Sequence, residues 1–431
     1  MSMKPAAYLA VGVVVGAGLC ALAAHGAVET NAYGQLDLFS TAFAKVRAEY
    51  VDPVPDDKLV SAAIQGMVSG LDPHSAYMDA KSFGGDFQVR TQGHFGGVGI
   101  EVSPDNGVIR VISAMDGMPA AAAGIKPDDR ITAINGAQVA DHDFNESIDK
   151  MRGVVGTKVV LTIERAGEKK PFDVTLARAN VPFEAVVHRR EGDIGYIRLP
   201  GFNEQTADGM EKAVRELKKE IGPGIRGYVL DLRNNPGGLL DQAIQVSDDF
   251  LNAGEIVSTR GRHAEDTQRF DAKSGDITDG KPVVVLINAG TASASEIVSG
   301  ALQDHRRATI IGMTSFGKGS VQTILPLGDG RGALRLTTAR YYTPSGHSIQ
   351  AQGIIPDIQV AQGDEVPKSE RYSEADLQGH LAGEPIAGSR LDAPVIYAAP
   401  GKKYDDFQLA YALDLLRGKE TVASVTKGGP G

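Results

Sequence analysis

Cysteine and clustered positive charge are both scarce in this sequence. Cys20 is the only cysteine among 431 residues, so the chain has no internal disulfide and no cysteine-based metal site. The formal net charge is -10 and no run of lysine and arginine stands out, which argues against a nucleic-acid partner. The composition is that of an ordinary globular protein, and we expect neither a cofactor nor a metal ion.

Long apolar runs are absent except for one at the N-terminus. The run from Tyr8 to Ala24 carries no charge, follows Lys4, and leads into small residues where a signal peptidase can cut. Residues 1–27 are therefore predicted to be an export signal, which is either removed or kept as a membrane anchor. Cys20 lies inside this signal, which suits an oxidising compartment. We expect a protein in the periplasm or on the outer face of the inner membrane.

Internal repeats are also absent, and four segments follow the signal. Residues 28–87 have apolar residues at helical spacing and contain two expected helices. Residues 88–180 are predicted to form a small mixed β domain with two short helices. Residues 361–431 are polar, with one expected helix over Asp405–Arg417 and a disordered end.

Residues 181–360 alternate predicted strands and helices, which is typical of an α/β core. The fold class is therefore predicted to be α/β. The expected helices are Thr206–Ile221, Leu239–Leu251 and Ser295–Asp304. The expected strands are Gly195–Leu199, Gly227–Leu232, Pro282–Asn288, Ala308–Gly312, Ser320–Pro326 and Gly332–Tyr342.

A strand-to-helix turn carries the sequence GTASASE at 290–296. Ser293 and Glu296 fit a capping box, in which the serine begins the helix and the glutamate closes its first turn. The same position suits a catalytic nucleophile, because free backbone N–H groups and the positive end of the helix dipole would stabilise an oxyanion there. The two roles are compatible, and the sequence leaves both open.

A serine nucleophile needs a base, and the sequence offers few. The nine histidines lie in no Gly-x-Ser-x-Gly or His-Glu-x-x-His context, and His305 closes a helix, where it suits the helix dipole. Lys318 lies between two glycines, and it is either an exposed loop lysine or the base. A lysine base must be neutral, so burial has to lower its pKa well below that of free lysine.

Residues 312–318 read GMTSFGK and match most of a phosphate-binding P-loop that follows a strand. The motif next requires serine or threonine, but Gly319 stands there. It also requires a helix, whereas residues 320–326 read as a β-branched strand. Nucleotide binding at this loop is therefore disfavoured.

Residues 231–238 read DLRNNPGG, a strand followed by a Pro-Gly-Gly turn. The turn is either a tight connection or a donor turn whose backbone N–H groups point into a site.

Four stretches in this order resemble the carboxy-terminal processing proteases, also called tail-specific proteases. The resemblance runs from about Asp37 to Asp357. It implies a crotonase-like ββα protease core with an inserted PDZ domain and helical N- and C-terminal segments. It also implies a serine endopeptidase that cleaves exported proteins at or near their C-termini. The matching stretches are DLRNNPGG at 231–238, GTASASEI at 290–297, GALQDH at 300–305 and FGKGSVQ at 316–322.

The resemblance also implies roles for single residues. The nucleophile falls on Ser293, the general base on Lys318, and the residue that orients the lysine on Gln322. The remaining matches are the oxyanion-binding backbone N–H groups of Gly238 and Ala294, the family acid Glu296, and Thr291, where many members have serine.

Residues 88–180 resemble a PDZ domain. The sequence FGGVG at 95–99 is implied to be the loop that takes the terminal carboxylate of a peptide, and the next strand is implied to pair with that peptide. Asp128 stands where a glycine is usual and is expected to distort one turn. Arg152 aligns with an arginine that links PDZ domain and protease in some relatives. The implied peptide-binding residues are Phe95, Gly96, Gly97, Val98 and Gly99.

The expected partners are protein or peptide substrates with apolar C-termini, and a homo-oligomer or an adaptor protein is left open. Two other functions remain as alternatives to proteolysis. The first is a non-catalytic scaffold in which the PDZ domain binds peptides, and the second, disfavoured, is a nucleotide-binding protein.

Overall fold

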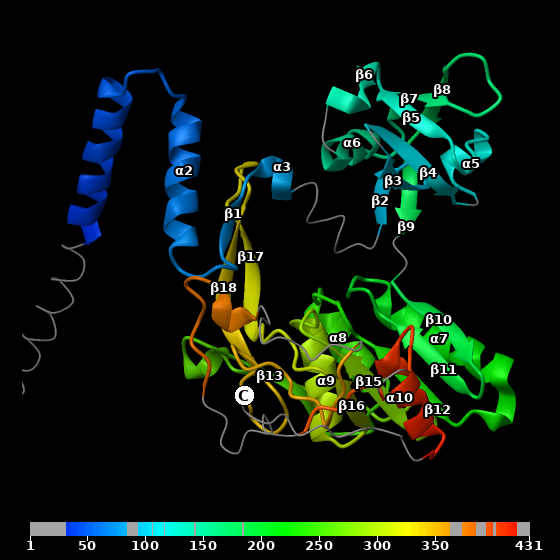
Figure 1. The fold of residues 1–431 in the computed structure, drawn as a ribbon. Helices are drawn as coiled ribbons and strands as arrows, with labels where there is room; N and C mark the ends of the chain where they lie inside the picture. The colour runs from blue at the N-terminus through cyan, green and yellow to red at the C-terminus, as the bar shows by residue number, and fades with distance from the viewer. Residues whose placement is uncertain are drawn as a thin grey trace, which may run out of the picture. The chain divides into compact units, whose positions relative to one another are not determined.

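The computed structural model of the chain is drawn in Figure 1. It describes the chain apart from residues 1–31, 84–93, 106, 116, 142–143, 183–184, 363–372, 385–393, 400–401 and 420–431. The described residues fall into two compact units, which divide after Val68. The predicted export signal and the predicted disordered end both lie outside the described residues.

The first unit contains two helices, one over residues 32–49 and the other α2 (Asp56–Ser69). Both were predicted from apolar spacing, and Pro53 and Pro55 lie between them because proline does not continue a helix. Several large apolar side chains of this region are exposed, among them Leu36 and Met67. Within the described residues, no helix is long and apolar enough to cross a membrane.

A six-stranded sheet is the centre of the α/β region of the second unit. Its strand order is β10-β11-β12-β15-β16-β19, with β10 antiparallel to β11 and all other pairs parallel. The strands are β10 (Val187–Glu191), β11 (Ile194–Arg198), β12 (Gly227–Asp231), β15 (Val283–Ile287), β16 (Ala308–Gly312) and β19 (Ile358–Gln359).

Helices cover both faces of this sheet, because successive side chains of a strand point to opposite faces. Leu230 of β12 packs in the core shared with α7, α8 and α9, whereas its neighbour Val229 packs in the core shared with α10. A sheet buried on both faces explains why every residue of β12 and β15 is buried and why β15 is apolar throughout. The predicted α/β class is confirmed. The helices are α7 (Thr206–Ile221), α8 (Leu240–Asp248), α9 (Ala294–Asp304) and α10 (Phe407–Leu416).

An antiparallel sheet lies next to this core in the fold. Its order is β1-β18-β13-β14, and β17 pairs with β18. The sequence predicted β17 and β18, but not the other three strands, which are short or polar. The strands are β1 (Ala76–Met78), β13 (Glu255–Gly261), β14 (Gln268–Asp271), β17 (Ser320–Pro326) and β18 (Ala333–Tyr342).

Residues 94–182 form a second β region with its own apolar core. Its main sheet has the order β3-β4-β5-β7-β8, with β6 beside β5, so β3 is an edge strand. A separate pair joins β2 to β9. Short helices α5 (Pro119–Ala122) and α6 (Phe144–Met151) accompany the sheet. The strands are β2 (His94–Gly97), β3 (Ile100–Asp105), β4 (Val108–Ala114), β5 (Arg130–Ile134), β6 (Ala137–Gln138), β7 (Lys158–Glu164), β8 (Phe172–Ala177) and β9 (Ala179–Pro182).

Asp128 has a φ of 66°, in the left-handed region that glycine adopts most easily. This agrees with the expectation that a glycine suits the position.

Candidate active site

Ser293 occupies a sharp turn between β15 and α9. Its φ and ψ are 56° and -114°, an unusual conformation for a residue with a side chain. A strained residue of this kind costs about 1–3 kcal/mol, and such residues cluster at functional sites. Ser293 is mostly buried, and Ala294 begins the helix. The turn therefore holds the hydroxyl in one place beside the N-terminus of α9.

Glu296 connects this turn to the loop that carries Lys318. Its carboxylate accepts the backbone N–H of Ser293 at 2.7 Å, and the same oxygen, Oε2, accepts the N–H of Lys318 at 2.9 Å. Its other oxygen accepts the N–H of Gly317 at 2.7 Å and the hydroxyl of Ser315 at 2.5 Å. Because one oxygen accepts both N–H groups, the backbones of Ser293 and Lys318 lie close together.

Glu296 is fully buried, and this burial raises the pKa of its carboxyl to about 7, although its four hydrogen bonds favour the ionised form. The sequence placed Glu296 in the first turn of the helix. The structure adds its hydrogen bonds to Ser315, Gly317 and Lys318.

The amine of Lys318 is held by β17. Its Nζ donates to Oε1 of Gln322 at 2.5 Å, and it lies 3.4 Å from the carbonyl oxygen of Ser320. Burial lowers the pKa of Lys318 to about 8, and it outweighs the nearby carboxylates of Glu374 and Glu296, which raise it. Lys318 is half-buried, so the alternative of an exposed loop lysine is wrong.

The Pro-Gly-Gly turn lies against Ser293. A Cβ added at Gly237 would be 2.8 Å from the Cβ of Ser293, and one added at Gly238 would be 2.0 Å from the carbonyl oxygen of Phe202. Both positions therefore require glycine. No hydrogen bond found among the described residues uses the N–H of Gly238 or of Ala294. These two donors, predicted to bind an oxyanion, thus remain available at the site.

Asn235 fixes the position of that turn. Its side chain donates to the carbonyl of Leu199 at 2.7 Å and accepts the N–H of Gly237 at 2.8 Å. Its backbone carbonyl accepts the N–H of Ala292 at 2.9 Å and the hydroxyl of Ser295 at 3.0 Å. The sequence analysis did not assign Asn235 a role, although it stands inside the DLRNNPGG stretch.

The strand before the turn is tied to the C-terminal helix. Arg233 donates to both carboxylate oxygens of Asp406, at 2.9 and 2.6 Å, and it also binds Asp231 and the side chain of Gln408. Asp406 caps α10 by accepting the N–H of Leu409 at 3.0 Å. The C-terminal segment is thus part of the support of the donor turn.

His305 lies at the opposite end of α9 from Ser293. The helix has 11 residues, which places its two ends about 16 Å apart. The Nε2 of His305 is 2.7 Å from the carbonyl oxygen of Glu255. This histidine is therefore outside the site, in agreement with its predicted place at the end of the helix.

The P-loop interpretation of residues 312–318 does not fit the structure. β17 follows where a phosphate-binding loop would need a helix, and the N–H groups of Gly317 and Lys318 already bind Glu296. The expectation of a strand over 320–326 is confirmed.

The predicted peptide-binding stretch differs in part from the expected loop. Phe95, Gly96 and Gly97 belong to β2, because β9 pairs with them, and only Val98 and Gly99 connect to β3. The N–H groups of Val98 and Gly99 have no acceptor among the described residues, and Gly99 has a φ of 73°. Two free donors thus precede the edge strand β3.

Arg152 follows α6, and its guanidinium is 3.8 Å from Asp149 of the same helix. The role predicted for it, linking the PDZ domain to the protease, stays a prediction.

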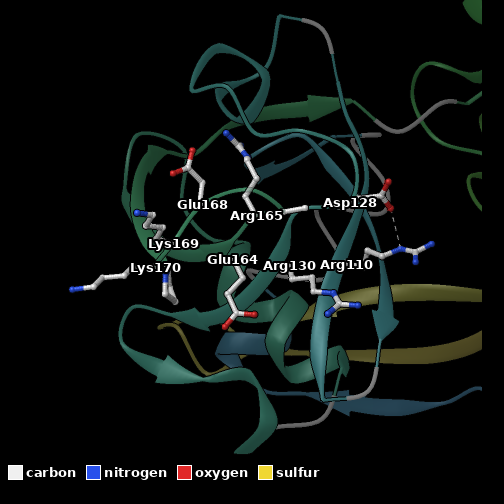
Figure 2. Close-up of a pocket in the computed structure, with 10 residues that line it drawn as sticks. Arg110, Asp128, Arg130, Glu164, Arg165, Glu168, Lys169 and Lys170 are labelled. Atoms are coloured by element: carbon white, nitrogen blue, oxygen red, sulfur yellow. Dashed lines mark ion pairs between the residues drawn. The ribbon is translucent and has the colours of Figure 1, made fainter.

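An open pocket on residues 94–182 contains none of the predicted site residues. Figure 2 shows that charges of both signs line it and that Arg110 pairs with Asp128. Its other charged residues are Arg130, Glu164, Arg165, Glu168, Lys169 and Lys170. Among the described residues, no group of three or more His, Cys, Asp or Glu side chains is placed to hold a metal ion.

Comparison with known proteins gives the family. Residues 193–360 match peptidase family S41, residues 96–176 match the PDZ domain, and residues 20–82 match the activating protease CtpB N-terminal domain. The chain is 53% identical over 406 residues to a carboxy-terminal-processing protease of Bartonella bacilliformis, a match that covers 92% of this chain and 91% of that protein. The chain belongs to the carboxy-terminal-processing proteases.

Further relatives of this protease family match smaller parts of the chain. The carboxy-terminal processing protease CtpA of Bacillus subtilis is 38% identical over 332 residues, covering 76% of this chain and 69% of that protein. A solved structure of the photosystem II D1 C-terminal processing protease is 29% identical, with a TM-score of 0.44, and covers 75% of this chain and 92% of that one. The predicted family and the predicted combination of a protease core with a PDZ domain are confirmed.

Proposed function

We propose that this carboxy-terminal-processing protease is a serine endopeptidase in which Ser293 is the nucleophile and Lys318 the general base. One observation carries the proposal: a single buried oxygen of Glu296 accepts the backbone N–H of both residues. Hydrolysis of a peptide bond needs a fixed hydroxyl, a neutral acceptor within reach of it, and donors for the oxyanion. Three features support this proposal: the buried turn of Ser293, the lowered pKa of Lys318, and the unused N–H groups of Gly238 and Ala294.

We propose the following reaction at these residues. Neutral Nζ of Lys318 takes the proton of the Ser293 hydroxyl as Oγ attacks the scissile carbonyl, and the N–H groups of Gly238 and Ala294 bind the resulting oxyanion. The ammonium then gives its proton to the leaving amine, and an acyl-enzyme remains. A water molecule attacks the acyl group, Lys318 takes one proton from that water, and it returns the proton to Oγ as the new C-terminus leaves.

Gln322 orients the base in this scheme. Its carbonyl oxygen accepts a hydrogen from Nζ, so the lone pair of the neutral amine can face elsewhere. Gln322 does not touch the reacting atoms, and it acts through Lys318.

The pH dependence of cleavage should report the protonation of Lys318. Its pKa is lowered to about 8, so below that pH the amine is charged and cannot accept the hydroxyl proton, whereas above it the amine is neutral. We therefore expect kcat/KM to rise with pH through about 8 and to stay high at alkaline pH. Initial rates on a peptide substrate between pH 5 and pH 10 measure this profile. A profile that is flat from pH 6 to pH 9 would contradict a lysine base.

We further propose that the PDZ domain selects substrates with a free, apolar C-terminus. The free N–H groups of Val98 and Gly99 support binding of the terminal carboxylate, and the edge strand β3 supports pairing with the peptide backbone.

Amidation of the substrate's C-terminus should weaken cleavage. The amide removes the negative charge that the Val98 and Gly99 donors would bind, and we expect KM to rise about tenfold or more, since charge-assisted hydrogen bonds are the stronger ones. Matched free and amidated peptides with the same apolar tail measure the difference. A peptide whose tail ends in two acidic residues serves as a second poor substrate. Equal kinetics for free and amidated tails would exclude the PDZ domain from substrate selection.

The physiological role that we propose is trimming of exported proteins near their C-termini, by an enzyme in the periplasm or on the outer face of the inner membrane. The apolar run within residues 1–27 supports export, as signal or as anchor. Incubating a cell-envelope extract with the enzyme or with a Ser293→Ala variant, followed by identification of new protein C-termini, tests this role. A peptide-binding scaffold without protease activity would give no new termini with either protein.

A further inference from the structure

The turn that follows α2 holds a buried carboxylate with many hydrogen-bond donors. Oδ1 of Asp72 accepts the N–H of His74 at 2.9 Å and the N–H of Ser75 at 3.0 Å, and Oδ2 accepts the hydroxyl of Ser75 at 2.6 Å. Burial alone would raise the pKa of Asp72, but these hydrogen bonds and one from Thr337 keep that pKa below its usual value. These hydrogen bonds therefore favour the ionised form of Asp72.

The same carboxylate reaches the middle of β18. The hydroxyl of Thr337 donates to Oδ1 of Asp72 at 3.0 Å, and the N–H of Thr337 donates to the hydroxyl of Ser75 at 3.1 Å. Directly after the turn, β1 pairs with β18, with Ala76 opposite Arg335. The turn is therefore fixed against the strand that neighbours β17.

A break in strand register brings Thr337 opposite the residue that binds the lysine. Val321 pairs with Ala339, but Gln322 pairs with Thr337, so Thr338 is an extra residue of a β-bulge. Bulges often occur beside active sites, where they redirect a side chain. Here the bulge places the amide nitrogen of Gln322 at 3.2 Å from the hydroxyl oxygen of Thr337.

The direction of these hydrogen bonds is decided by the charge on Asp72. A threonine hydroxyl has one hydrogen, and an ionised carboxylate can only accept. Since Thr337 gives its hydrogen to Asp72, its oxygen can only accept from Gln322. The NH2 end of the Gln322 amide must then face Thr337, and its carbonyl end must face Nζ of Lys318. With the amide reversed, its NH2 group would face Nζ, where it would oppose the charged amine and would occupy the lone pair of the neutral amine.

We propose that Asp72 is a positioning residue of the protease, which fixes through Thr337 the end of the Gln322 amide that faces the amine of Lys318. This inference rests on the proposed role of Lys318 as the base. It extends the site to a turn about 250 residues away in sequence, directly after α2.

The charge on Asp72 acts on the base in addition to its hydrogen bonds. Four charged groups face Lys318: Glu374, Glu296 and Asp72, which raise its pKa, and Arg335, which lowers it. His74 binds Glu374 at 2.8 Å, so the same turn also holds the carboxylate with the largest influence on Lys318. Removing the charge of Asp72 should therefore lower the pKa of Lys318.

The variant Asp72→Asn tests the proposal with little risk to the turn, because the asparagine oxygen still accepts the N–H groups of His74 and Ser75. The asparagine side chain can also donate a hydrogen bond to the hydroxyl of Thr337. The direction of the hydrogen bond between Thr337 and Gln322 is then no longer fixed. We expect kcat on a peptide substrate to fall roughly 10-fold to 100-fold with KM unchanged, the effect of a slightly misplaced catalytic group. We also expect the rise of kcat with pH to move to lower pH. Asp276→Asn is a control away from the site: Asp276 accepts the N–H and hydroxyl of Thr278 in a similar turn, and it also pairs with Arg307, so the variant should lose stability while kcat stays unchanged.

A double-mutant cycle separates positioning from a general loss of stability. In a Gln322→Ala background, Asp72→Asn should change kcat less than about twofold, because the amide through which it acts is gone. Independent, multiplicative losses in the two variants would overturn the proposal, and so would wild-type kinetics for Asp72→Asn.

Two further variants keep the test decisive. If Asp72→Asn does not fold, Thr337→Val replaces it as the test, because valine has nearly the same shape as threonine and the turn of Asp72 is left intact. This variant should lower kcat, and the loss should again depend on Gln322. The pH profile should not shift, because the charge of Asp72 is kept. Lys318→Ala tests the proposed function separately. If it remains active, the base is wrong, whereas an inactive Lys318→Ala with unaffected Asp72 and Thr337 variants overturns the positioning role alone.

Discussion

Replacing Ser293 by alanine is expected to lower kcat/KM by about 1000-fold or more while the protein stays folded, as for other serine nucleophiles. Alanine keeps a Cβ, so the strained backbone is unchanged, and the loss of capping should cost at most about 1 kcal/mol of unfolding free energy. Peptide cleavage assays and thermal unfolding followed by circular dichroism measure the two effects.

Ser295→Ala is the matched control for this experiment. Ser295 is two residues away and buried, but its hydroxyl donates to the carbonyl of Asn235. Its replacement should cost about 1 kcal/mol of stability and retain most of the activity. An active Ser293→Ala together with an inactive, folded Ser295→Ala would show that the nucleophile is misassigned.

Lys318→Arg is expected to be as inactive as Lys318→Ala, with losses of about 1000-fold or more. Arginine keeps the positive charge and some of the hydrogen bonds, but it does not deprotonate in proteins, so it cannot take the hydroxyl proton. Gln322→Ala should have a smaller effect, because Gln322 only orients the amine. Steady-state kinetics at pH 9, where neutral lysine would dominate, provide the comparison.

His305 provides the control for the choice of base. It lies at the far end of α9, so His305→Gln should leave kcat nearly unchanged even if stability falls. Substantial activity in Lys318→Arg, or loss of activity on replacing His305 alone in a folded protein, would rule out Lys318 as the base.

The central core could be predicted well because each of its strands and helices has a strong local pattern. The strand expected over Pro282–Asn288 is β15, and the helix expected over Thr206–Ile221 is α7 with the same bounds. Fully apolar runs and a regular apolar spacing give the same signal in any surroundings. By contrast, β10 and β14 are short and polar, and they form only because a neighbouring strand pairs with them.

The site was predictable where its residues lie close together in sequence. Ser293, Glu296 and Lys318 fall within 26 residues, and their motifs identified them. The capping box predicted one hydrogen bond of Glu296, the one from the N–H of Ser293. The other three could not be foreseen, because their donors come from a loop on the far side of a helix and a strand. Asp72 was assigned no role from the sequence, since nothing in its local sequence indicates a threonine 265 residues later.

The contact between Arg233 and Asp406 has a consequence for how the enzyme matures. Proteins are made and translocated from the N-terminus, and Asp406 follows Arg233 by 173 residues. Until α10 has been made and has folded onto the core, the buried guanidinium of Arg233 lacks one of its two carboxylate partners. An incomplete buried ion pair costs several kcal/mol of folding free energy. The turn that presents Gly238 therefore gains its full support last. A nascent chain, or one that has lost α10, would have the proposed nucleophile and base but a less rigid proposed oxyanion site, so we expect full activity only when α10 is present.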